Sequence, residues 1–129
     1  MGRRRFDRRG AMGTHRYQHV HHSADEPALL ARLRRDGMRI VAIDNVPGAV
    51  SLMGYAWRPE SAMVFGQEQV GVAPHALAVA DDVVYIPQYG STRSLNVGTA
   101  SGIAMYSYAA AVLGEPPGWG HVTPAPSDQ

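Results

Sequence analysis

The chain of 129 residues contains no cysteine and no lysine, and these two absences exclude several kinds of chemistry. Without cysteine it cannot form disulfides, Cys-ligated zinc sites, iron–sulfur clusters or thiolate nucleophiles, and an intracellular protein is the simplest expectation. All 12 basic residues are arginine, so Schiff-base and general-base mechanisms that use lysine are excluded as well. At this length we expect one domain around one core.

Long hydrophobic runs are also scarce. The longest, at 97–113, contains glycine, threonine and serine, and it is shorter than the ~20 residues that span a bilayer. The arginines at 3–5 are not followed by the apolar stretch of a signal peptide. We therefore expect a cytoplasmic protein with no membrane segment, in which residues 97–113 form a buried helix.

Charge is distributed unevenly along the chain. Residues 1–22 hold six arginines against one aspartate, whereas residues 23–129 hold six arginines against ten acidic residues. A basic head on a weakly acidic body is typical of contact with a polyanion, although a solvated terminus explains it equally well. His19 and His21 share one face of a possible strand at 16–21, but no carboxylate or cysteine completes a ligand set, and we predict no metal site.

Strands and helices alternate in the predicted secondary structure. Apolar β-branched runs predict strands at 39–43, 62–65 and 83–86, and helical spacing with capping residues predicts helices at about 26–36, 74–80 and 94–113. Continuous apolar strands are typical of a mostly parallel sheet covered by helices on both faces, so the predicted fold class is α/β. Ligands in such folds bind beyond the C-terminal ends of the strands.

Two segments follow those strand ends and combine glycine with polar side chains. In the first, residues 64–72, a strand runs into Gly66, and Glu68 and Gly71 follow. In the second, residues 86–97, a strand ends at a proline, and a hydroxyl-rich loop leads to Ser94, which we expect to cap the next helix. Taken separately, each segment is more typical of a purely structural loop than of a ligand site.

Taken together and in this order, the two segments resemble motifs of the SpoU (TrmH-like) branch of the SPOUT RNA methyltransferases. Residues 66–71, Gly-Gln-Glu-Gln-Val-Gly, resemble the family's G-[NQ]-E-x-x-G motif. Residues 86–106 resemble I-P-[MQ]-x-G-x-x-x-S-L-N-V and the helix that follows it. The resemblance covers roughly residues 10–112. The family's first motif, Asn-x-Gly followed by an arginine, has no counterpart in residues 1–9.

The resemblance implies a deep trefoil knot, S-adenosylmethionine as cofactor, and methyl transfer to a ribose 2′-hydroxyl of tRNA or rRNA. It also implies a homodimer that uses the helix at 97–113, including Ala104 and Tyr108. The implied domain is 1–113, shortened at its N-terminus and with a basic head at 1–22, followed by a flexible tail at 114–129. The implied residues are Gly66, Ile86 and Leu95 for the cofactor, with 43–45 as a weaker candidate; Glu68, Ser94 and Asn96 for catalysis; and Arg93, Arg3, Arg4 and Arg5 for RNA.

Two other readings stay open at this level. The missing first motif is consistent with a relative that binds S-adenosylmethionine or RNA without full catalysis. A nucleotide-binding α/β domain unrelated to RNA is the third reading. Binding of S-adenosylmethionine distinguishes the third reading from the others, and methyl transfer to RNA distinguishes the first from the second.

Overall fold

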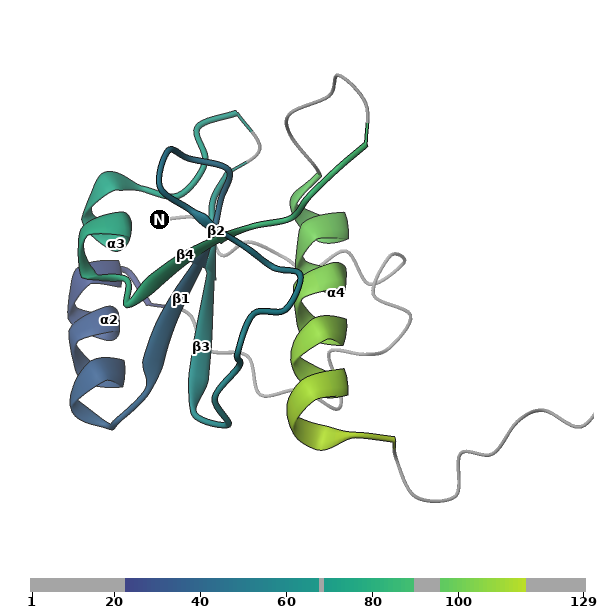
Figure 1. Ribbon diagram of the computed structural model, residues 1–129. Coiled ribbons are helices and arrows are strands. Elements are labelled where there is room, and N and C mark those ends of the chain that lie inside the picture. Colours follow the sequence, from purple (N-terminus) through teal and green to yellow (C-terminus); the bar gives the residue numbers. More distant parts are fainter. Residues whose placement is uncertain (1–22, 68, 90–95, 116–129) are drawn as a thin grey trace, which may run out of the picture.

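A four-stranded parallel sheet with helices on both faces forms the fold (Figure 1). The computed structural model describes residues 23–67, 69–89 and 96–115. The strand order is β2-β4-β1-β3. The elements are α2 (Glu26–Arg35), β1 (Arg39–Ile43), β2 (Val50–Ser51), β3 (Ser61–Phe65), α3 (Pro74–Val79), β4 (Asp82–Tyr85), α4 (Val97–Tyr108) and the π-helical turn η2 (Ala109–Leu113).

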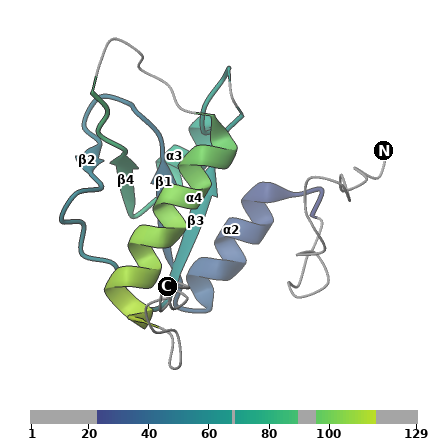
Figure 2. The same ribbon diagram turned by 90° about the vertical axis from the view of Figure 1, so that its right-hand side faces the viewer.

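The central strand β1 divides the core into two clusters. Its side chains alternate, so Ile40 and Ala42 face α2 and α3 while Val41 and Ile43 face α4. The first cluster is completed by Leu30, Val72 and Ala76, and the second by Leu52, Trp57, Val84 and Ala104. Seen from the side of α4, this helix lies along the strands and covers one face of the sheet (Figure 2). The predicted α/β fold with two covered faces is confirmed.

Local signals place most element boundaries. Asp25 caps α2, its Oδ1 accepting the N–H of Ala28 at 3.1 Å, and Gly37 ends the helix with a φ of +84°. The predicted cap of α4 was wrong: the N-cap is Asn96, whose side chain accepts the N–H groups of Gly98 and Thr99. Ser94 lies outside the described residues, as do the predicted strand at 16–21 and the loop 90–95 of the expected knot. The knot therefore stays a prediction.

The segment between β2 and β3 fastens α4 to the sheet. Trp57 Nε1 donates to Ser107 Oγ at 2.9 Å, and the Tyr108 hydroxyl donates to the carbonyl of Pro59 at 2.6 Å. The ring of Trp57 also meets the rings of Tyr55 and Tyr108 edge-on, with centroids 4.8 and 5.7 Å apart. These contacts set the position of α4, and with it the position of the helix start beside the strand ends. In the described ranges, no helix is long and apolar enough to span a membrane.

Candidate functional site

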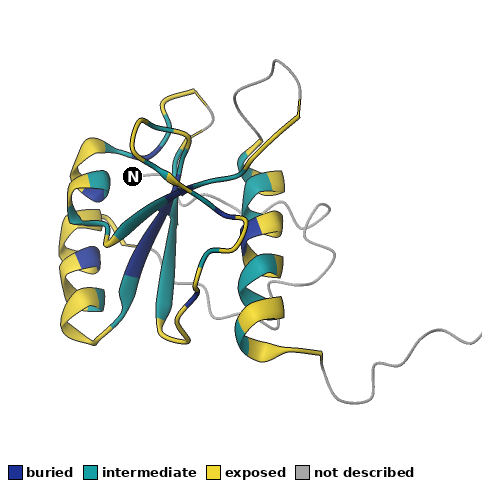
Figure 3. Cartoon of the chain, viewed as in Figure 1, coloured by how far each residue is buried: buried dark blue, intermediate teal, exposed yellow. Residues whose placement is uncertain are grey.

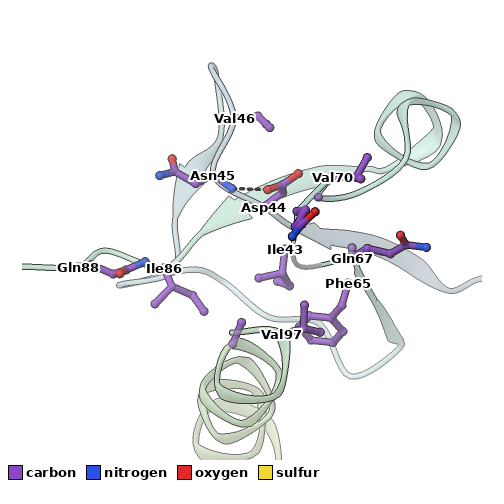
Figure 4. Close-up of a pocket in the computed structure, with 14 residues that line it drawn as sticks. Ile43, Asp44, Asn45, Val46, Phe65, Gln67, Val70, Ile86, Gln88 and Val97 are labelled. Carbon is purple, nitrogen blue, oxygen red and sulfur yellow. Dashed lines mark hydrogen bonds between the residues drawn. The ribbon is translucent and has the colours of Figure 1, made fainter. Parts of the chain in front are cut away.

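A pocket of about 330 Å³ opens at the C-terminal edge of the sheet, where β1, β3 and β4 end beside the start of α4 (Figure 4). A volume in this range suits a small molecule of nucleotide size. The pocket combines apolar walls with amide and carboxylate groups. Its lining comprises Ile43, Asp44, Asn45, Val46, Phe65, Gly66, Gln67, Gln69, Val70, Gly71, Ile86, Gln88, Val97 and Ala100.

A tight loop after β3 forms one wall of the pocket. Gln67 and Gly71 exchange two backbone hydrogen bonds, at 2.8 and 3.2 Å, which bring the two ends of the loop together. A Cβ atom at Gly66 would overlap the backbone of Gly71 and Val72. Gly66 is therefore required for the close approach of two backbone segments, and Gly71, with a φ of +74°, for the turn itself.

The carboxylate of Asp44 ties this loop to the end of β1. Oδ1 accepts the N–H of Asn45 at 2.9 Å, and Oδ2 accepts the N–H of Val72 at 3.0 Å. A Cβ atom at Gly71 would lie 2.7 Å from Asp44 Oδ2, so glycine there also makes room for the carboxylate. The sequence placed residues 43–45 at a strand end but did not single out Asp44. An acidic residue directly after a buried strand was the available signal.

The motif at residues 86–106 contributes the opposite wall of the pocket and the start of α4. Ile86 and Gln88 follow β4 and line the pocket together with Val97 and Ala100 of α4. Asn96 precedes these helical residues, and its Oδ1 accepts the N–H of Gly98 at 2.7 Å. The amide of Asn96 is thus held in place at the start of the helix.

The structure brings some of the predicted site residues together and leaves others undescribed. Gly66 and Ile86, from two different motifs, line the same pocket. Asn96 directly precedes Val97, which also lines it. The two motifs therefore meet in space as the resemblance implies. Outside the described residues lie Glu68, Ser94, Leu95, Arg93, Arg3, Arg4 and Arg5.

A cluster of charged and phenolic groups lies at the other edge of the sheet, where β1 and β4 begin. Arg39 Nη2 donates to Asp82 Oδ2 at 2.7 Å, and the Tyr55 hydroxyl donates to the same oxygen at 2.7 Å. The hydrogen bond from Tyr55, followed by the one from Arg39, lowers the pKa of Asp82. Burial is the main cause that raises the pKa of Tyr55. None of these three residues lines the pocket, and we infer that the cluster stabilises the fold.

The rest of the described residues offers no second candidate site. A cavity of about 380 Å³ between α2 and α3 is lined by Pro27, Ala31, Arg34, His75 and Val79, none of which belongs to a predicted site. Within residues 23–67, 69–89 and 96–115, no three histidine or acidic side chains gather as a metal site would require. The pocket at the strand ends is therefore the candidate site.

Comparison with known proteins finds relatives that match a large part of the chain. Residues 4–106 match the SpoU rRNA Methylase family. A curated relative from Borreliella burgdorferi, tRNA (guanosine(18)-2′-O)-methyltransferase, is 40% identical over 76 residues, which cover 59% of this chain and 35% of that protein. The chain thus matches about a third of the relative's length.

Solved structures show the same fold. The Aquifex aeolicus TrmH/SpoU tRNA modifying enzyme superposes with a TM-score of 0.77 at 26% identity, over 83% of this chain and 54% of that one. The SpoU methyltransferase AviRb from Streptomyces viridochromogenes, solved in complex with AdoMet, superposes with a TM-score of 0.60 at 22% identity, over 72% of this chain and 38% of that one. The second likeness, at this low identity, concerns the fold alone.

Proposed function

This chain belongs to the SpoU rRNA Methylase family, and from that premise we propose that it transfers a methyl group from S-adenosylmethionine to a ribose 2′-hydroxyl of tRNA or rRNA. The observation that carries the proposal is the shared pocket, which is lined by Gly66 of one motif, after β3, and by Ile86 of the other, after β4, on either side of the end of β1. The tRNA 2′-O-methyltransferase activity of the Borreliella relative, named above, supports the same reaction class.

The pocket residues fit S-adenosylmethionine. When bound, this cofactor supplies a methyl group on a positively charged sulfonium and is left as the neutral thioether S-adenosylhomocysteine. Glycine at position 66 lets the backbone of Gly71 and Val72 pack directly against it, and this close approach shapes the pocket wall whose peptide groups would bind the ligand. Phe65, Ile86 and Val97 offer apolar contact for a flat base. We assign cofactor binding to Gly66, Ile86 and Leu95.

For the reacting ribose we assign Glu68, Ser94 and Asn96, the polar positions of the two motifs. Asn96 is held by its hydrogen bonds to the first turn of α4, and preorganised groups of this kind favour transfer by orienting the reactants. A group that takes the hydroxyl proton is also needed, and Glu68 is the acidic residue of the matched motifs.

RNA contact is assigned to the arginines Arg93 and Arg3–Arg5. Phosphate contacts by arginine position a nucleic acid without reading its sequence. They also make binding sensitive to salt, because each neutralised phosphate releases counterions.

We further propose that two copies of the chain associate through the outer face of α4. Met105 and Tyr106 on this face are 53% and 77% exposed, and Leu113 extends the apolar surface. Of the two residues that the sequence assigned to this contact, Ala104 was wrong and Tyr108 stays a prediction. Ala104 is fully buried in the core of the single chain, and the half-buried Tyr108 packs on Trp57 and donates a hydrogen bond to the carbonyl of Pro59.

A transfer assay tests the proposed reaction. The chain is incubated with tritiated-methyl S-adenosylmethionine and, separately, with total tRNA and rRNA. We expect label in RNA that resists alkaline hydrolysis next to the modified nucleotide, because a 2′-O-methyl group blocks attack on the neighbouring phosphate. Binding of S-adenosylhomocysteine without label in either RNA contradicts the transfer and favours a relative that binds the cofactor without catalysis.

A further inference from the structure

Among the described residues that line the pocket, one is ionisable, and it is Asp44. Its two oxygens accept the N–H groups of Asn45 and Val72, at 2.9 and 3.0 Å. A carboxylate offers about four acceptor positions, so two of them are still available after these bonds. In the part of the chain that the structure describes, Asp44 forms no ion pair with arginine or histidine.

We propose that Asp44 makes the pocket selective for a cationic ligand, so that it binds the sulfonium of S-adenosylmethionine more tightly than the neutral thioether of S-adenosylhomocysteine. This inference rests on the proposed function of the site. It goes beyond that function because it assigns a specificity-determining charge to a residue outside the matched motif positions. It also implies easier release of the spent cofactor, whose sulfur has lost its charge.

The expected size of the preference follows from the electrostatics of partly enclosed charges. An opposite charge within about 4–6 Å shifts an ionisation equilibrium by ~1–3 pKa units, which corresponds to a factor of ~10–1000. The pocket is open to solvent on one side and Asp44 is only half-buried, so screening reduces the effect. We therefore expect the lower end of that range, about a tenfold preference for the cation.

A competing interpretation gives Asp44 a positioning role only. In that case the carboxylate holds the loop 66–72 by its bond to Val72, and the ligand does not sense its charge. The two interpretations differ in what they predict for ligands that match in shape but differ in charge. Loss of the hydrogen bond to Val72 weakens the binding of all such ligands equally, whereas loss of the charge weakens the binding of the cation alone.

Calorimetric titration of the full chain separates the two roles. The probes are S-adenosylhomocysteine, S-adenosylmethionine and sinefungin, which carries a protonated amine in place of the methylsulfonium and transfers nothing. Asp44→Asn removes the charge and keeps the size. Asp44→Glu keeps the charge and disturbs the hydrogen bond to Val72 that holds the loop. The matched control, Asp36→Asn, removes the same charge at the C-terminal end of α2, where the side chain is 62% exposed.

We expect wild type and Asp36→Asn to bind sinefungin and S-adenosylmethionine about tenfold more tightly than S-adenosylhomocysteine. Asp44→Asn should abolish that ratio, and Asp44→Glu should retain it even where every affinity falls. Equal weakening of all three probes in Asp44→Asn overturns the inference. If that variant does not fold, wild type decides, because a chain that binds the thioether and the cations equally contradicts it. A wild type that binds none of the three contradicts the proposed function itself.

Discussion

The two faces of the sheet are covered by helices of different character. On one face, α2 buries Leu30 and turns Arg32, Arg34 and Arg35 outward, as expected of a helix whose outer side meets water. On the other face, α4 contains no charged residue, buries Ala104 and leaves large apolar side chains uncovered (Figure 3). The outer side of α2 is thus rich in charge, whereas the uncharged, apolar outer side of α4 is suited to a further partner.

The difference extends to how each helix is attached and to what it serves. On one side, α2 and α3 pack on the sheet by apolar contact, and exposed polar contacts such as the one from Arg34 to the carbonyl of Val79 join the two helices. On the other side, α4 is fastened by part-buried and exposed hydrogen bonds that involve Trp57 and Tyr108 and by the aromatic contacts around them. Because Val97 and Ala100 of α4 line the pocket, a change in the position of α4 also changes the pocket. Stability and cofactor binding should therefore be coupled on this face and separable on the other.

The largest expected effect comes from removing the anchor of α4. Trp57→Ala deletes a side chain that is 9% exposed, together with its bond to Ser107 Oγ, and should lower the free energy of unfolding by ~3–5 kcal/mol. It should also weaken binding of S-adenosylhomocysteine by at least tenfold, since α4 shifts away from the pocket. Denaturant unfolding and calorimetric titration measure the two effects.

Leu30→Ala is the matched change on the opposite face, where the side chain is 4% exposed. It should cost ~2–5 kcal/mol of stability and leave the affinity of the folded fraction within about twofold of wild type. A comparable loss of affinity in both variants would show that the two faces are not separable.

The second prediction concerns the uncovered side of α4. A double substitution, Met105→Asp with Tyr106→Asp, places charge in the proposed contact between copies and should raise the dimer dissociation constant by about 100-fold or more. Sedimentation at micromolar concentration measures it. Leu29→Asp, an equally simple change at a position 38% exposed on α2, should leave the dimer intact. A wild type that sediments as a monomer contradicts the proposed association.

The third prediction concerns the hydrogen bond from Tyr55, in the segment between β2 and β3, to Asp82 of β4. Tyr55→Phe removes the hydrogen bond to Asp82, and in this half-buried setting it should cost ~1 kcal/mol near neutral pH. Because folding lowers the pKa of Asp82, its ionised form stabilises the protein above the ordinary carboxyl value of 3.8, and this contribution is lost as the pH falls through the lower folded value.

The stability difference between wild type and Tyr55→Phe should accordingly shrink as the pH falls below about 4. Urea unfolding of both proteins at neutral and acidic pH measures it. A difference that stays constant down to the acid limit would mean that the hydroxyl does not act through the ionised carboxylate.

Local sequence patterns predicted those strands and helix ends that are marked by a few neighbouring residues. The apolar run at β1 and the glycine that ends α2 were placed correctly, because burial and a positive φ each leave a mark at a single position. The two-residue strand β2 was missed because it is too short to show a period. Ser94 and Asn96 are both good N-caps two residues apart, and the choice depends on how the preceding loop meets the helix.

In the candidate site, too, residues within one motif could be predicted from the sequence, whereas contacts between distant residues could not. Gly66 and Ile86 were found because each belongs to a motif that is contiguous in sequence. The link from Asp44 to Val72 joins residues 28 positions apart, and no sequence pattern connects them. The placement of Ala104 and Tyr108 on the inner side of α4 could not be derived either, since the helix is apolar on every side and its sequence does not indicate which side faces the sheet.

The smallest expected effect gives the sharpest test of the outer side of α4. Gly102 lies within the helix, and a Cβ atom there would meet no atom within 4 Å in the single chain. Gly102→Ala should therefore stabilise the isolated chain by ~0.5–1 kcal/mol, because alanine favours the helix more than glycine does. If a second copy packs closely on this side, the same methyl group separates the two helices and weakens the dimer. The prediction is thus of opposite sign for the two equilibria: a higher free energy of unfolding when the protein is dilute enough to be monomeric, and a larger dissociation constant by sedimentation. An increase in stability with an unchanged dimer would place Gly102 outside the contact and shift the proposed interface toward Met105 and Leu113.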